Sequence, residues 1–133
     1  MVKTHSSYLP LGTKLPQFEM LNVNSEKMET FNFSSLNERN LLIIFICAHC
    51  PFVKYVENEI SKITLEIQDY VQTIAISSND VLNYPDDSPV NLRKQAIKNK
   101  WYFPYLYDKD QSFAKKLKAA CTPDFYLFLN TDK

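Results

Sequence analysis

Two cysteines, Cys47 and Cys50, are separated by two residues and followed directly by Pro51. Thiols at that spacing around a turn can approach closely enough to form a disulfide. The same pair can also supply half of a zinc site, because structural zinc takes four cysteine or histidine ligands. The spacing therefore indicates either thiol–disulfide chemistry or a metal site.

Pro51 predicts where the following helix begins. Proline is favoured at the first helical position, because its missing N–H would have no partner there. Cys50 is then at the helix N-terminus, where unpaired N–H groups and the helix dipole stabilise a thiolate. We expect Cys50 to be the nucleophile and Cys47, three residues earlier, to be the resolving thiol.

Other interpretations of the cysteines stay open. Unreactive buried cysteine is common in protein cores, and Cys47 taken alone fits that description. A zinc site would need Cys47, Cys50, Cys121 and one histidine together at this junction. We expect no metal and no organic cofactor, and we expect His49 to be a loop or packing residue rather than a catalytic base.

The segments around the cysteines alternate between strand and helix patterns. Residues 41–46 are continuously apolar, as in a strand buried on both faces. An apolar stripe at steps of three and four then predicts one face of a helix, formed by Val53, Val56, Ile60, Ile63 and Ile67. The other predicted elements are a hairpin over 18–33, strands at 71–76 and 125–129, a helix capped by Ser88 and running to about 99, an extended piece at 103–105 and a short helix capped by Asp110. This order predicts a single α/β domain over residues 1–133 with a largely parallel central sheet.

Composition and charge exclude several classes of partner. Fifteen basic residues balance fifteen acidic ones, so nothing draws the chain to nucleic acid or to an anionic membrane. The longest apolar stretch, 41–47, is too short to span a bilayer. Residues 1–10 carry no secretory pattern, and three cysteines without such a signal do not suggest a disulfide scaffold. We therefore expect a cytoplasmic protein with reduced thiols.

A single glycine in 133 residues leaves the turns to other residue types. Asn, Asp and Pro are the usual substitutes in turns. We expect them to take the positions where the backbone needs an unusual conformation.

Five segments, taken in order, resemble the peroxiredoxin-like redoxins of the thioredoxin superfamily. This is the AhpC/TSA-like group described as thioredoxin family proteins or thiol–disulfide isomerases. The resemblance covers nearly the whole chain from about Leu11, and it implies a thioredoxin-like fold, with a central mixed sheet, flanking helices and an N-terminal hairpin, and thiol–disulfide exchange. The segments are Phe45-Ile46-Cys47-Ala48-His49-Cys50-Pro51-Phe52-Val53-Lys54, Ala75-Ile76-Ser77-Ser78-Asn79-Asp80, Tyr84-Pro85-Asp86-Asp87-Ser88-Pro89, Phe103-Pro104-Tyr105-Leu106-Tyr107-Asp108 and Ala120-Cys121-Thr122-Pro123-Asp124-Phe125.

The resemblance also implies roles for residues near the cysteines. Pro123 would be a cis-proline that faces them, and Thr122 would offer its backbone to a bound substrate segment. His49 and Pro51 would complete the substrate-binding residues. Cys121 would lie close to Cys50 and would be a second possible resolving thiol.

Two departures from related patterns bear on the reaction. Thioredoxin has its resolving cysteine where this chain has Val53. Peroxiredoxins carry Pro-x-x-x-Thr-x-x-Cys, and here Cys47 occupies the place of the threonine. We therefore predict a thiol–disulfide oxidoreductase that acts on protein or small-molecule disulfides with a separate thiol reductant. The alternatives are a thiol-dependent peroxidase and a non-enzymatic binding or structural module.

The family pattern continues beyond residues 125–129 with another strand and a terminal helix, whereas this sequence ends at Lys133. The last strand should therefore form an uncovered edge of the sheet. A homodimer is one way in which that edge could be covered.

Overall fold

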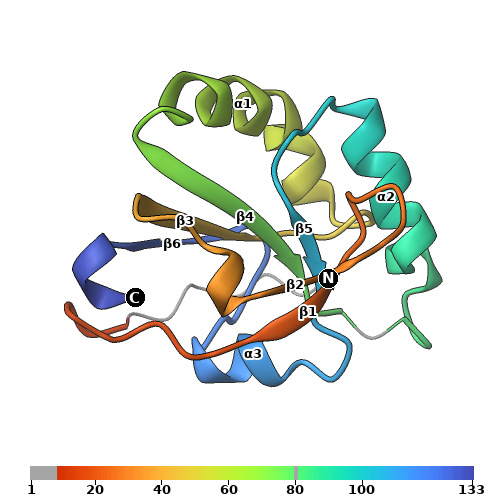
Figure 1. Cartoon of the computed structure of the whole chain (residues 1–133). Helices are drawn as coiled ribbons and strands as arrows, with labels where there is room; N and C mark the ends of the chain where they lie inside the picture. Colours follow the sequence, from red (N-terminus) through yellow and green to blue (C-terminus); the bar gives the residue numbers. More distant parts are fainter. Residues whose placement is uncertain (1–8, 80) are drawn as a thin grey trace.

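A computed structural model describes residues 9–79 and 81–133 of the chain. Within them, one mixed sheet of six strands has the order β2-β1-β5-β4-β3-β6. Figure 1 shows α1 and α2 on one face of this sheet and α3 on the other. The thioredoxin-like α/β fold predicted from the sequence is confirmed. The elements are β1 (Glu19–Asn22), β2 (Thr30–Asn32), β3 (Asn40–Phe45), α1 (Pro51–Ile67), β4 (Val71–Ser77), α2 (Pro89–Lys98), β5 (Tyr105–Tyr107), α3 (Ser112–Lys116) and β6 (Asp124–Phe128), with short 3₁₀ turns η1 (Phe33–Ser35), η2 (Pro85–Asp87) and η3 (Asn130–Asp132).

The central strands are parallel and the outer ones antiparallel. β4 pairs in parallel with β3 and β5, while β6 pairs antiparallel with β3. β1 and β2 form the predicted N-terminal hairpin, which joins the sheet through β5. The parallel pairs place the carboxyl ends of β3 and β4 at one edge, and the connections that follow them approach each other there.

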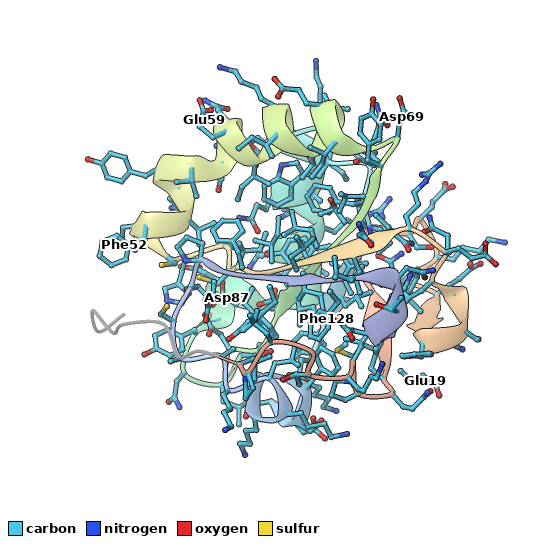
Figure 2. The ribbon with its side chains drawn as sticks, turned by 90° about the vertical axis from the view of Figure 1, so that its left-hand side faces the viewer. Glu19, Phe52, Glu59, Asp69, Asp87 and Phe128 are labelled. Carbon is cyan, nitrogen blue, oxygen red and sulfur yellow. The ribbon has the colours of Figure 1, made fainter. Side chains whose placement is uncertain are left out.

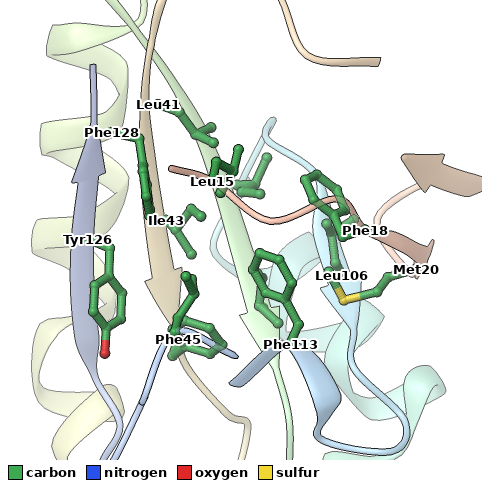
Figure 3. Close-up of a cluster of buried hydrophobic side chains, with 13 residues drawn as sticks. Leu15, Phe18, Met20, Leu41, Ile43, Phe45, Leu106, Phe113, Tyr126 and Phe128 are labelled. Carbon is green, nitrogen blue, oxygen red and sulfur yellow. The ribbon is translucent and has the colours of Figure 1, made fainter. Parts of the chain in front are cut away.

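β3 is buried on both faces, as its continuous apolar sequence predicts. Ile43 and Phe45 pack with Phe113 of α3 in the core on one side, which Figure 3 shows. Ile44 and Ile46 pack on the other side, in a second core that includes Val53 of α1. Two layers of apolar side chains thus fix the end of β3 where Cys47 follows.

The helix that follows the cysteines begins where Pro51 predicts. Cys50 is the N-cap of α1, and the Lys54 amide donates to the Cys50 carbonyl at 3.1 Å. The predicted apolar face of this helix is partly wrong. Ile63 is 49% exposed, whereas Thr64 is buried and donates its hydroxyl to the Ile60 carbonyl at 2.7 Å. That local hydrogen bond satisfies the hydroxyl and lowers the free-energy cost of burying it.

The short helix α3 begins differently from the prediction. Asp110 stands one residue before the cap, which is Gln111 in a left-handed conformation, but its carboxylate does accept the Ser112 amide at 3.1 Å. The buried Asp108 carboxylate accepts the next two amides, those of Phe113 and Ala114, at 3.2 and 2.9 Å. An acceptor further back in the chain can cap this helix because the left-handed residue turns the chain toward it.

The prediction for which residue types take the left-handed turns is also wrong. Within the described residues, Met28, Lys100, Gln111 and Lys118 have positive φ, in addition to Gly12, and none of them is Asn or Asp. Lys100 and Lys118 each follow a helix end. The two amides after each end bond back in the Schellman pattern, so the hydrogen bonds set the conformation whatever the side chain.

β6 forms one edge of the sheet, as predicted. Its inward side chains are buried, while Phe125, Leu127 and Leu129 are each at least half exposed. No helix in the described part of the chain is long and apolar enough to cross a membrane. The prediction for residues 1–10 lies mostly outside the described residues.

Candidate active site at the β3–α1 junction

Cys47 lies just beyond β3 and has no exposed surface. Its Sγ is 3.5 Å from the Thr122 hydroxyl oxygen, and its carbonyl accepts the Gln95 side-chain amide at 3.0 Å. Burial raises the pKa of the Cys47 thiol to about 12, and the charge of Asp87 acts in the same direction. Cys47 is therefore a thiol rather than a thiolate at neutral pH.

Cys50 is equally buried at the start of α1. Its Sγ is 3.5 Å from the Thr122 carbonyl oxygen. Thr122 thus contacts both cysteine sulfurs, one through its hydroxyl and the other through its backbone. The pair predicted from the spacing comes together around this one residue, although 72 positions separate it from Cys50.

The loop that carries Thr122 contains the other two predicted residues. The Thr122–Pro123 peptide bond is cis, in agreement with the prediction for Pro123. Cys121 is partly buried, and its Sγ lies 3.9 Å from the Pro123 carbonyl oxygen. The structure therefore places all three cysteines on two adjoining loops.

A groove of about 610 Å³ begins beside Pro123. It runs along β6, between residues 123–129 and the amino-terminal residues 9–13, with Asp132 at its wall. Its lining includes the cis-proline Pro123 but none of the three cysteines.

Asp87 is the residue that the sequence did not reveal as part of the site. It ends η2, has no exposed surface and points its carboxylate at the segment between the cysteines. Oδ1 accepts the Ala48 and His49 amides at 2.7 and 3.0 Å, and Oδ2 accepts the Asn79 side-chain amide at 2.9 Å and pairs with His49 Nδ1. Figure 2 shows Asp87 toward the same side of the molecule as Phe52, the second residue of α1.

His49 is held from two sides. Nδ1 pairs with Asp87, and the ring stacks on Tyr84 with centroids 4.6 Å apart. Nε2 is buried and has no hydrogen-bond partner within the described residues. His49 was expected to be a loop or substrate-binding residue, but the structure gives it a defined orientation against a buried carboxylate.

Cys47, His49 and Asp87 are close enough to be considered as a metal site. One potential ligand atom from each lies within 4.8 Å of the others. The set differs from the sequence-derived zinc candidates, because Asp87 joins it. However, the four N–H donors on Asp87 already use the acceptor positions of its carboxylate. These contacts describe a closed hydrogen-bonded network rather than an open ligand set.

Comparison with known proteins identifies relatives of the whole chain. The model of the AhpC/TSA family matches residues 11–131. An uncharacterized conserved protein from Geobacillus kaustophilus is 40% identical with a TM-score of 0.94, over 100% of this chain and 70% of that one. A hypothetical protein from Sinorhizobium meliloti is 30% identical with a TM-score of 0.91, over 98% of this chain and 70% of that one.

A more distant structure shares the fold. A secreted Mycobacterium tuberculosis disulfide oxidoreductase is 16% identical with a TM-score of 0.72, over 88% of this chain and 79% of that one. No curated protein matches the sequence significantly.

Proposed function

The chain belongs to the AhpC/TSA family, and from that premise we propose that it is a thiol–disulfide oxidoreductase with Cys50 as nucleophile and Cys47 as resolving thiol. The observation that carries the proposal is the contact of both sulfurs with Thr122, at 3.5 Å each. Two thiols that meet at one residue beside a helix N-terminus have the arrangement that disulfide exchange needs.

The order of the two thiols follows from their surroundings. Cys50 caps α1, where the helix N–H groups favour negative charge. Cys47 lies before the helix and is held protonated by burial. Cys50 therefore attacks first, and Cys47 acts only after a mixed disulfide has formed.

The reaction proceeds in two exchange steps. Cys50 thiolate attacks one sulfur of a substrate disulfide, forms a mixed disulfide and expels the other sulfur as a thiolate. Cys47 then attacks Cys50 Sγ and expels the second substrate thiolate. The substrate gains two electrons, and the Cys47–Cys50 disulfide that remains is reduced by a separate thiol system.

Substrate must reach sulfurs that have no exposed surface. The Thr122 carbonyl lies against Cys50 Sγ, so the loop around Thr122 and Pro123 must move as the substrate disulfide arrives. The groove of about 610 Å³ that begins beside Pro123 follows an edge strand, and such an edge can accept an extended peptide, which supports a protein disulfide as substrate. Relatives of this fold that are named for disulfide oxidoreduction agree with this chemistry.

Single-cysteine variants test the proposal with insulin as a protein disulfide and dithiothreitol as the reductant. Cys50→Ser should abolish turnover, and Cys47→Ser should accumulate a mixed disulfide with the substrate that mass spectrometry detects. Cys121→Ser is the matched control and should keep full turnover.

Three results would contradict the proposal in different ways. Activity in Cys50→Ser would exclude Cys50 as nucleophile. Full turnover in Cys47→Ser, lost only when Cys121 is also replaced, would make Cys121 the resolving thiol. Fast consumption of hydrogen peroxide, together with no reduction of the insulin disulfides, would favour a peroxidase.

A further inference from the structure

Asp87 is a buried carboxylate without a lysine or arginine partner in the described part of the chain. Its charge is balanced by four N–H donors, two of them the amides of Ala48 and His49. Holding a carboxylate in this way costs desolvation energy that a neutral side chain would not cost. Ala48 and His49 separate the cysteines, so the carboxylate is hydrogen-bonded directly to the segment between the two thiols.

The Asp87 carboxylate sets the tautomer of His49. Since Asp87 accepts from Nδ1, the neutral ring carries its proton on that nitrogen and has an unprotonated Nε2. If the ring gains a second proton, the adjacent carboxylate stabilises the resulting imidazolium. The stack on Tyr84 holds the ring in this orientation. Nε2 can therefore take up a proton while Asp87 holds the proton on Nδ1.

The resolving step needs such a group. Cys47 reacts as a thiolate, but at neutral pH a thiol whose pKa is about 12 is ionised in only about one molecule in 10⁵. Cys47 Sγ lies within 4.8 Å of an Asp87 carboxylate oxygen and of a His49 ring nitrogen. Proton transfer needs a shorter separation, and Cys47 Sγ can approach the pair once the Thr122 loop, whose hydroxyl it contacts, has shifted to admit the substrate.

We propose that the Asp87–His49 pair accepts the proton of Cys47 as Cys47 attacks the mixed disulfide on Cys50. The Cys47–Cys50 sulfur bond forms while the bond from Cys50 to the substrate sulfur breaks, and the electron pair of that bond leaves with the substrate thiolate. The proton moves to the unprotonated Nε2 of His49, whose Nδ1 proton Asp87 holds, and then to the departing thiolate. This step rests on the proposed function and assigns Asp87 and His49 to its second half only.

Other titratable groups face the pair or Cys47 from the neighbouring elements. They are Cys50 at the start of α1, Tyr84 before η2, Tyr105 of β5 and Glu57 of α1, which reaches Cys47 through Gln95. None of them lies in the hydrogen-bonded pair itself. The variants below change the pair and leave these groups in place.

The two halves of the reaction can be timed separately with dithiobis(nitrobenzoate), whose thiolate absorbs visible light. The first thiolate is released when Cys50 attacks and the second when Cys47 resolves. The experiment uses Cys121→Ser as background, so that Cys47 alone can resolve, and contains a chelator. The test variants are Asp87→Asn and His49→Gln. Asp108→Asn is the matched control, because Asp108 is another buried carboxylate that accepts backbone amides, at α3.

The first phase should stay within about twofold in every variant, since Cys50 does not depend on the pair. In Asp87→Asn the second phase should fall by on the order of 10² near neutral pH, which is the usual contribution of a positioned base. It should then rise about tenfold for each pH unit, because hydroxide replaces the missing acceptor. His49→Gln should show the same pH profile, and Asp108→Asn should match the background.

Two results would overturn the proposal. A second phase that is unchanged or faster in Asp87→Asn would mean that the carboxylate only suppresses the Cys47 thiolate. Equal slowing of both phases at every pH would mean that Asp87 only shapes the loop. If Asp87→Asn does not fold, His49→Gln decides by the same criteria. A background protein that shows the first phase but no second phase would instead contradict the proposed function.

Discussion

Replacing Cys47 with serine should remove a specific loss of stability at alkaline pH. Burial raises the pKa of this thiol from 9.0 to about 12 in the folded protein. Above pH 9 the unfolded chain therefore releases a proton that the folded chain keeps. Because the folded state binds more protons, the free energy of unfolding falls as pH rises through this range and would level off only near pH 12.

The size of this effect follows from the two pKa values. Each pH unit between them is worth about 1.4 kcal/mol for one proton. Integrated from about pH 8 to about pH 10, the contribution of Cys47 to the loss is about 1.4 kcal/mol, because almost all of the change lies above pH 9. Urea unfolding of the reduced wild-type protein and of Cys47→Ser, at both pH values, measures this contribution as a difference of differences.

The comparison separates the effect of Cys47 from the effects of the other groups that titrate at alkaline pH. Burial also raises the pKa values of Tyr105 and Tyr126, and that effect cancels because both proteins contain these tyrosines; the charge of Cys47, which also raises the Tyr105 pKa, acts only when Cys47 is ionised. Any pH-independent cost of the serine cancels as well. If wild type and Cys47→Ser lose stability in parallel, Cys47 is not a buried protonated thiol, and the need for a proton acceptor in the resolving step disappears.

Two further predictions concern the scaffold around the site. Gln95→Leu should lower the free energy of unfolding, measured in urea, by about 2–4 kcal/mol, because the Cys47 carbonyl and the Tyr105 hydroxyl would both lose a buried hydrogen-bond partner. Adding Tyr105→Phe should recover part of that loss, and no recovery would contradict the assigned bonds. Lys118→Gly should raise the free energy of unfolding by about 0.5–1 kcal/mol without changing the rate of thiol–disulfide exchange. Lys118 has φ of 56° at the end of α3, a left-handed conformation that glycine adopts without the steric strain of a side chain. A decrease in the free energy of unfolding would contradict the left-handed conformation of this residue.

The sequence predicts the β3–α1 junction well because its determinants are local. A continuous apolar run specifies a strand buried on both faces, and Pro51 specifies the first residue of the helix. These two signals place Cys50 at the N-cap without reference to the rest of the chain. The contact of both sulfurs with Thr122 required the family pattern as well, since no local feature connects residues so far apart.

The remaining features depend on contacts that the sequence does not contain. Asp87 lies 38 positions from His49, in a segment whose polar composition resembles any loop. Only the parallel pairing of β3 and β4 brings their two connections to the same edge of the sheet. The left-handed lysines after α2 and α3 were missed for a related reason, because Schellman hydrogen bonds rather than residue type determine them.

The pairing of Cys50 after mild oxidation tests the central claim most directly. The reduced protein is exposed to a small excess of a disulfide oxidant, remaining thiols are alkylated, and the bonds are mapped by mass spectrometry of proteolytic fragments. The proposed mechanism predicts a disulfide between Cys47 and Cys50, with Cys121 alkylated. Oxidised protein in which Cys50 is bonded to neither Cys47 nor Cys121 would contradict the assignment of this junction as a redox site.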